Sequence, residues 1–304
     1  MSQKTLSMLF VALGMALPSP SAATINVFAC EPEWAALARE IGGNKVIAYS
    51  ATHAGQDPHH IRARPSLIAR IRRADLVFCS GAGLEVGWLP LLMQRGARSG
   101  VQPGQSGNLM AASHVTVLEK PQILDRSMGD IHPEGNPHVH LDPNNLAILA
   151  RELTKRLVLI DAGNANHYRN RLAAFNKEWG QLLVKWRAQT HALVGMAVVV
   201  HHKSFTYLFR WLSLNEAGTL EVKPGIPPTA SHLNSILNIT KQQKVKAILR
   251  APYDSSDASQ WLARKTGIPA IELPYTVARD AGPGALANLF ERTIQLLSKA
   301  RTGA

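Results

Sequence analysis

The sequence lacks a second long hydrophobic run, an arginine-rich stretch and an internal repeat. The apolar run at residues 6–17 is too short to span a bilayer comfortably, and no later segment approaches its length. The cationic residues are scattered without an aromatic-basic repeat, which argues against a nucleic-acid partner. Of the 304 residues, 46% are hydrophobic and 18% charged, as in a globular protein long enough for two domains.

The N-terminus has the three parts of a secretory signal peptide. Lys4 gives the positive region, residues 6–17 the apolar region, and Ser21, Ala22 and Ala23 a small-residue cleavage site. A membrane anchor is the alternative, but the apolar run is short for that role. We therefore expect residues 1–23 to be removed and the mature protein to be exported.

The cysteines and the charge leave alternatives open. Cys30 and Cys79 each end a predicted strand, so they could form a disulfide if those strands are neighbours, or remain two buried thiols. Lipidation of Cys30 is not expected, because the bulky Phe28 makes a poor processing site. We attribute the formal net charge of +12 to docking or solubility.

Predicted strands and helices alternate on both sides of one long helix, which indicates parallel βαβ units. The first series of expected strands covers residues 25–29, 46–49, 75–79 and 115–118. Its expected helices cover residues 31–40, 62–73, 84–95 and 144–159, and residues 96–113 are expected to be a surface loop. The second series has expected strands at residues 197–200, 247–249 and 270–273, with helices ending at Trp211 and over residues 231–240, 257–266 and 286–300.

The long helix is predicted over residues 164–191, where an apolar stripe alternates spacings of four and three. Such a helix would be about 40 Å long and could act as a rigid strut. We therefore predict an α/β fold with two lobes, each containing a mainly parallel sheet. The expected divisions are residues 1–23 for the signal peptide, 24–163 for the N-terminal lobe, 164–192 for the linking helix and 193–304 for the C-terminal lobe.

Histidines cluster beside the predicted strand ends, where parallel sheets bind ligands. Asn136 and Asp142 each precede a proline and should be extended, so His138 and His140 should project to the same side. Loops from different βα units can converge, which suggests a metal site between them. The clusters are His59 and His60, then His132, His138 and His140, and finally His201 and His202.

Three stretches around these histidines resemble the histidine motifs of one family, the zinc/manganese-type (cluster A-I) substrate-binding proteins of metal ABC transporters. The stretches are residues 57–66, 136–145 and 199–207, and residues 220–233 resemble a further stretch of that family. The resemblance covers nearly the whole mature chain in the right order. It implies two αβ lobes, a long helix between them and one metal ion in the interlobe cleft.

The resemblance also implies the ligands. They would be His59, His138 and His202, with His60 and His201 outside the coordination shell. The chain departs from the family pattern in having His140 in place of a tryptophan, Lys203 where an acidic residue often stands, and no carboxylate at residues 274–277. The fourth ligand is therefore open between Asp280, His132, His140 and water.

The donor set favours Zn²⁺, because imidazole suits zinc whereas Mn²⁺ prefers oxygen ligands. Three histidines with an open position also occur in catalytic zinc sites, but the sequence has no His-Glu-x-x-His motif that would supply a general base. We predict a periplasmic, monomeric, non-enzymatic protein that delivers Zn²⁺ to a membrane ABC permease. The alternatives are a manganese carrier, an exported zinc hydrolase, and a metal-free binding protein or adhesin.

Overall fold

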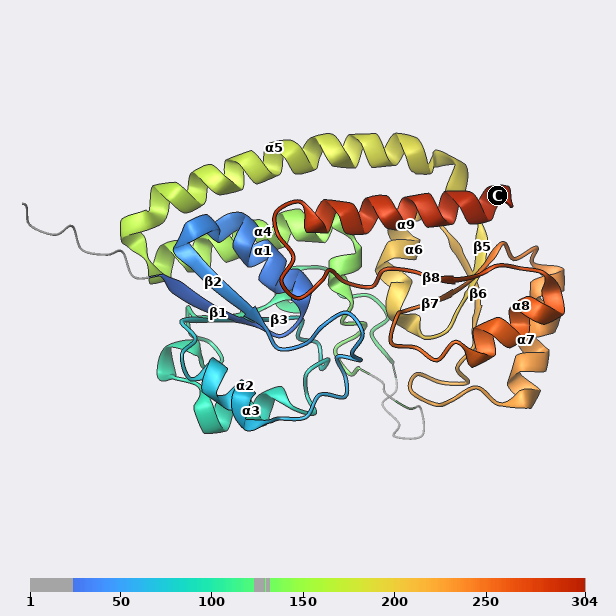
Figure 1. The fold of residues 1–304 in the computed structure, drawn as a ribbon, viewed down its shortest axis with the longest axis horizontal. Coiled ribbons are helices and arrows are strands. Elements are labelled where there is room, and N and C mark those ends of the chain that lie inside the picture. Colours follow the sequence, from blue (N-terminus) through green and yellow to red (C-terminus); the bar gives the residue numbers. More distant parts are fainter. Residues whose placement is uncertain (1–23, 123–128, 130–131, 304) are drawn as a thin grey trace, which may run out of the picture.

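The computed structural model describes residues 24–122, 129 and 132–303, so the predicted signal peptide lies outside the described residues. Two α/β lobes lie below one long helix (Figure 1). The strands are β1 (Ile25–Ala29), β2 (Val46–Ser50), β3 (Leu76–Cys79), β4 (Asn108–Met110), β5 (Ala197–Val200), β6 (Asn215–Thr219), β7 (Ala247–Arg250) and β8 (Ala270–Glu272). The α-helices are α1 (Pro32–Gly42), α2 (Pro65–Ile71), α3 (Leu89–Gly96), α4 (Pro143–Ile160), α5 (Ala165–Thr190), α6 (Thr206–Leu212), α7 (Ala230–Gln242), α8 (Asp257–Thr266) and α9 (Ala285–Thr302).

Each lobe contains a four-stranded sheet in which all paired strands are parallel. The strand orders are β2-β1-β3-β4 and β6-β5-β7-β8, so the two lobes have the same topology. The central strands β3 and β5 are buried along their whole length, as expected for parallel strands covered on both faces. The predicted α/β fold with two parallel sheets and a long helix is confirmed.

The fourth strand of the first sheet was predicted at the wrong place. Residues 115–118 form no strand; instead the carbonyl of Leu118 accepts a hydrogen bond from Asn136 N, and the backbone N–H of Leu118 donates one to the Tyr207 hydroxyl. The sheet is completed by β4, inside the stretch expected to be a loop. The polar strand β6 was also not predicted, because its sequence has little β propensity.

The helix predicted over residues 84–95 begins only at Leu89. The preceding turn is held by the buried carboxylate of Glu85, which accepts hydrogen bonds from the backbone N–H groups of Ser80 (2.7 Å) and Gly81 (3.0 Å). Pro90 then lies in the first turn of α3, where a missing N–H has no cost. The turn therefore displaces the start of the helix.

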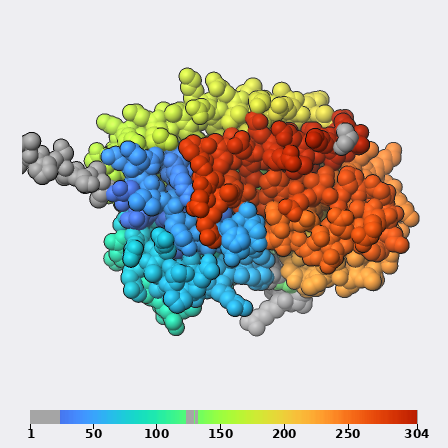
Figure 2. Space-filling model, viewed as in Figure 1, coloured from blue at the N-terminus to red at the C-terminus, as the bar shows by residue number. Residues whose placement is uncertain are grey.

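A continuous core below α5 joins the two lobes. Trp179 of α5 stacks on Phe175 and meets Trp186 edge-on, with ring centroids 5.2 and 5.4 Å apart. Phe290 of α9 packs against both tryptophans, and α9 runs beside α5 (Figure 1). Figure 2 shows the red C-terminal residues lying against both the blue first lobe and the orange second lobe. No helix of the described residues is long and apolar enough to be a membrane span.

A disulfide between Cys30 and Cys79 resolves the alternative that the sequence left open. The two Cα atoms lie 4.8 Å apart, at the carboxyl ends of the adjacent strands β1 and β3. Both residues are fully buried. The bond therefore links two residues that are 49 positions apart in the sequence, at the base of the loops that follow these strands.

Replacing both cysteines by serine (Cys30→Ser with Cys79→Ser) should lower the free energy of unfolding by about 2–4 kcal/mol, because the unfolded chain regains the freedom that the loop closure removes. Chemical denaturation of the wild type and the double variant, with and without a reductant, measures this change. Reduction should destabilise the wild type and leave the variant unchanged. Equal stability of the oxidised and reduced wild type would contradict the prediction.

Candidate metal site

The structure brings together the three histidines that the sequence pattern selected. His59 follows β2, His138 precedes the short 3-10 helix η5 (Val139–Leu141), and His202 follows β5. One ligand nitrogen from each of the three lies within 4.8 Å of the others. The ring centroids of His59 are 5.6 Å from those of both His138 and His202. The three imidazoles thus form a compact cluster between the lobes.

Hydrogen bonds to core residues fix the loops that carry the first two histidines. Trp88 Nε1 donates to the carbonyl of Pro58 at 3.0 Å, immediately before the first histidine. The backbone N–H of His138 donates to Asn136 Oδ1 at 3.1 Å, and the buried Tyr207 hydroxyl donates to the carbonyl of Asn136 at 2.7 Å. The rings are therefore placed by anchored backbone.

Each of the three rings has its Nδ1 nitrogen held by an oxygen atom. Asp57 Oδ1 lies 2.6 Å from His59 Nδ1, and Glu221 Oε2 lies 2.7 Å from His202 Nδ1. The Tyr275 hydroxyl lies 2.7 Å from the corresponding nitrogen of His138. These contacts leave Nε2 of each ring as the nitrogen available to a metal ion. Such outer partners orient ligand imidazoles and, when they are carboxylates, increase their basicity.

These outer partners were not predicted from the sequence. Asp57 could have been found, since it lies two residues before His59 and accepts a hydrogen bond from the backbone N–H of that histidine at 2.9 Å. Glu221 and Tyr275 are 19 and 137 residues from their partners, and no local pattern marks them.

In each of the two histidine doublets, one histidine belongs to the cluster and its neighbour lies outside it. The side chain of His60 is 66% exposed, whereas that of its neighbour His59 is 10% exposed. His201 is buried, and its Nδ1 atom has no hydrogen-bond partner among the described residues. Neither His60 nor His201 belongs to the compact cluster.

Electrostatics keep part of this cluster unprotonated. Burial, followed by the charges of His59 and His202, holds the pKa of His138 well below its usual value. Burial also lowers the pKa of His132, to about 4. Burial alone would lower the pKa of His202, but the hydrogen bond and charge of Glu221 outweigh it and raise that pKa. The cluster thus combines neutral imidazoles, which a metal ion requires, with a carboxylate that compensates charge.

The candidates for a fourth ligand lie in three different places. His132 is beside the cluster, with its Nε2 atom 3.1 Å from that of His59. Both nitrogens of His140 have other neighbours: its Nε2 lies 2.9 Å from the carbonyl oxygen of Tyr275, and its Nδ1 is 3.2 Å from Glu33. Asp280 is exposed and lines a separate cavity with Arg39 and Arg171.

A cavity of about 350 Å³ opens beside the histidines and receives side chains from both lobes. His132, His138 and His202 contribute to its wall. Lys203 lies at the same cavity, and its ammonium group pairs with Glu119 at 2.7 Å across the lobes. The cavity therefore connects the cluster to the interlobe cleft.

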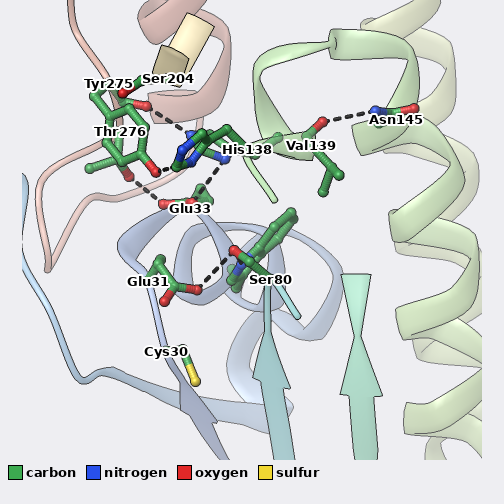
Figure 3. Close-up of polar contacts among 12 residues, drawn as sticks. Cys30, Glu31, Glu33, Ser80, His138, Val139, Asn145, Ser204, Tyr275 and Thr276 are labelled. Carbon is green, nitrogen blue, oxygen red and sulfur yellow. Dashed lines mark hydrogen bonds and ion pairs between the residues drawn. The ribbon is translucent and has the colours of Figure 1, made fainter. Parts of the chain in front are cut away.

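The buried carboxylates of Glu31 and Glu33 lie near the segment that carries Tyr275 and Thr276 (Figure 3). Thr276 of the second lobe donates to Glu33 of the first, and the Ser80 hydroxyl donates to Glu31 at 3.1 Å. Burial and the neighbouring charge of Glu85 raise the pKa of Glu31 well above its usual value. The bond between Thr276 and Glu33 ties the start of α1 to the segment that carries Tyr275, and so supports the position of His138.

Comparison with known proteins gives a consistent result. The sequence resembles PsaA of Streptococcus pneumoniae, a manganese ABC transporter substrate-binding lipoprotein, at 22% identity over 82% of this chain and 79% of the relative. SloC of Streptococcus mutans, a metal ABC transporter substrate-binding lipoprotein, is 21% identical over 83% of this chain and 81% of the relative.

Solved structures share the fold at similarly low sequence identity. A crystal structure of ZnuA superposes with a TM-score of 0.76 at 22% identity, covering 91% of this chain and 99% of that one. The laminin-binding protein Lmb of Streptococcus agalactiae, described as an adhesin with metal-transporting activity, gives a TM-score of 0.73 at 20% identity, covering 91% and 99%. A family model described as "Zinc-uptake complex component A periplasmic" matches residues 27–300. The chain therefore belongs to this family of metal ABC transporter substrate-binding proteins.

Proposed function

We propose that this protein is a periplasmic zinc carrier that binds one Zn²⁺ ion through His59, His138 and His202 and delivers it to a membrane ABC permease. The observation that carries the proposal is the cluster of three imidazoles, each with its Nδ1 atom already held by an outer oxygen. This arrangement leaves the Nε2 atom of each ring available to an ion held between the three histidines. The family membership supports the metal ion and the permease as partners.

The choice of zinc over manganese rests on the donor atoms. Mn²⁺ prefers carboxylate and other oxygen ligands, whereas imidazole suits Zn²⁺. The nearby carboxylates of Asp57 and Glu221 are bonded to imidazole nitrogens and serve as outer partners. PsaA carries manganese in its name, but at 22% identity its metal does not decide the preference of this chain.

We infer that the protein carries out no covalent chemistry. A zinc hydrolase needs a general base within hydrogen-bond reach of the metal-bound water. Asp57 and Glu221 each have an oxygen 2.6–2.7 Å from an imidazole, where they orient ligands instead. Ester hydrolysis by the zinc-loaded protein would support the alternative of an exported hydrolase.

The proposed carrier is exported and acts as a monomer. Residues 1–23 have the composition of a signal peptide, and the family description places its members in the periplasm. We further propose the lobe limits 24–163 and 193–304, with residues 164–192 as the linker. These limits agree with the place of α5 in the sequence, after the last strand of the first sheet and before the first strand of the second.

A competitive chelator titration with Zn²⁺ and Mn²⁺ tests the carrier function. The wild type should show one tight zinc site and much weaker manganese binding. His59→Ala, His138→Ala and His202→Ala should each reduce zinc affinity by about 100-fold or more, above the usual cost of losing an outer-shell partner. His60→Ala and His201→Gln are the matched controls within each doublet and should stay close to the wild type.

Two results would contradict this proposal. If the wild type binds neither ion tightly, the protein shares only the scaffold of the metal carriers. If the control variants lose affinity and their neighbours do not, the ligands within the doublets are the other histidines.

A second prediction concerns the outer carboxylates. Asp57→Asn and Glu221→Gln should each lower zinc affinity by about 10–100-fold, because the neutral amides no longer increase the basicity of the imidazoles. Glu119→Gln is the control, since this carboxylate lines the same cavity but pairs with Lys203. The same titration measures all three variants. An unchanged affinity in both outer-carboxylate variants would show that they do not tune the site.

A further inference from the structure

The fourth coordination position is not filled by the residues that the family pattern would suggest. Residues 274–277 contain no carboxylate. The nitrogens of His140 face Tyr275 and Glu33, and Asp280 lies at another cavity with two arginines. Among the described residues, His132 lies beside the group of three whose ligand atoms are within 4.8 Å of one another, with its ring centroid 5.1 Å from that of His59 and 6.4 Å from that of His138.

We propose that His132 is the fourth zinc ligand, so that four imidazoles hold the ion. This inference rests on the proposed function and specifies the coordination of the same site. Its Nε2 atom lies 3.1 Å from His59 Nε2. Zn–N bonds of about 2.0–2.1 Å place the nitrogens of a tetrahedral site about 3.3–3.4 Å apart. The observed separation is thus close to one edge of such a tetrahedron.

Local backbone structure places His132 at this position. The carbonyl of His132 accepts a hydrogen bond from Gly135 N at 2.9 Å, which closes a turn. Asn136, the next residue, is bonded through its backbone N–H to Leu118 at 2.8 Å. Gly135 has φ of +102° and lies so close to Leu118 that a Cβ atom would be 2.5 Å from the Leu118 carbonyl oxygen. The turn is therefore fixed against the first lobe, and the ring of His132 extends to the wall of the cavity.

Charge balance agrees with four neutral donors. Asp57 and Glu221 supply two negative charges to the imidazoles and so compensate Zn²⁺ without contacting it. A fourth ligand without charge completes a neutral assembly, which suits a partly buried site. Four nitrogen donors also strengthen the preference for zinc over manganese.

The competing explanation is a hydrogen bond between two imidazoles. His59 Nδ1 faces the carboxylate of Asp57 and therefore carries a hydrogen, which leaves a lone pair on Nε2. His132 could then donate its own Nε2–H to that lone pair. This explanation places His132 outside the coordination shell. The number of imidazole rings bound to the zinc ion therefore distinguishes the two explanations.

X-ray absorption at the zinc edge of the wild-type protein gives that count without a variant. We expect four imidazole rings and no oxygen ligand. Three rings with one oxygen atom would overturn the proposal, whatever the effect of a substitution on affinity.

His132→Ala provides the second measurement. Zinc affinity in the chelator titration should fall by about 100-fold or more, beyond the usual outer-shell effect. The visible spectrum of the Co²⁺-loaded variant should change, because a water oxygen would replace one of the four nitrogen donors. His191→Ala, at the exposed end of α5, is the control and should match the wild type in both measurements.

The outcomes distinguish this inference from the proposed function. Tight zinc binding by the wild type, with unchanged affinity and spectrum in His132→Ala, overturns only the role of His132. Absence of tight zinc binding in the wild type overturns both.

Discussion

Aromatic packing below α5 fixes how the two lobes lie relative to each other, and the distances within the histidine cluster depend on that arrangement. Trp179, Trp186 and Phe290 join the linking helix to α9, and the same core extends to both sheets. Burying each such ring contributes about 1.5–3 kcal/mol. A movement of the lobes that separated these rings would therefore cost free energy.

The sequence predicted the helices and strands whose own residues show a strong periodicity or composition. The stripe of α5 and the β-branched strand β5 were found because their periodicity or composition is strong. The strand β4 is three residues long and β6 is polar, so neither has a detectable alternation. Residues 115–118 resemble a strand in composition. The backbone groups of Leu118, however, form hydrogen bonds with Tyr207 and Asn136 and not with a neighbouring strand. These partners are distant in sequence, which explains the wrong prediction.

The candidate site shows the same division between local and distant information. His59, His138 and His202 stand in motifs that can be recognised along the chain, and the structure brings them together. The orientation of His140 differs from the extended arrangement predicted, because residues 139–141 form a 3-10 helix and Tyr275 and Glu33 from other elements lie at its nitrogens. The outer partners Glu221 and Tyr275 are set by tertiary packing alone. Sequence thus indicates which side chains can bind a metal, and packing decides their orientation.

The contacts at Nδ1 have a consequence for the thermodynamics of ion capture. Asp57, Tyr275 and Glu221 restrict the imidazole rings before any ion arrives. The side-chain entropy of these rings is therefore lost when the chain folds, and not when the ion binds. The free-energy cost that remains for capture is mainly the removal of water from the ion. Ions that release their hydration shell reluctantly are then at a disadvantage that no rearrangement of the protein offsets.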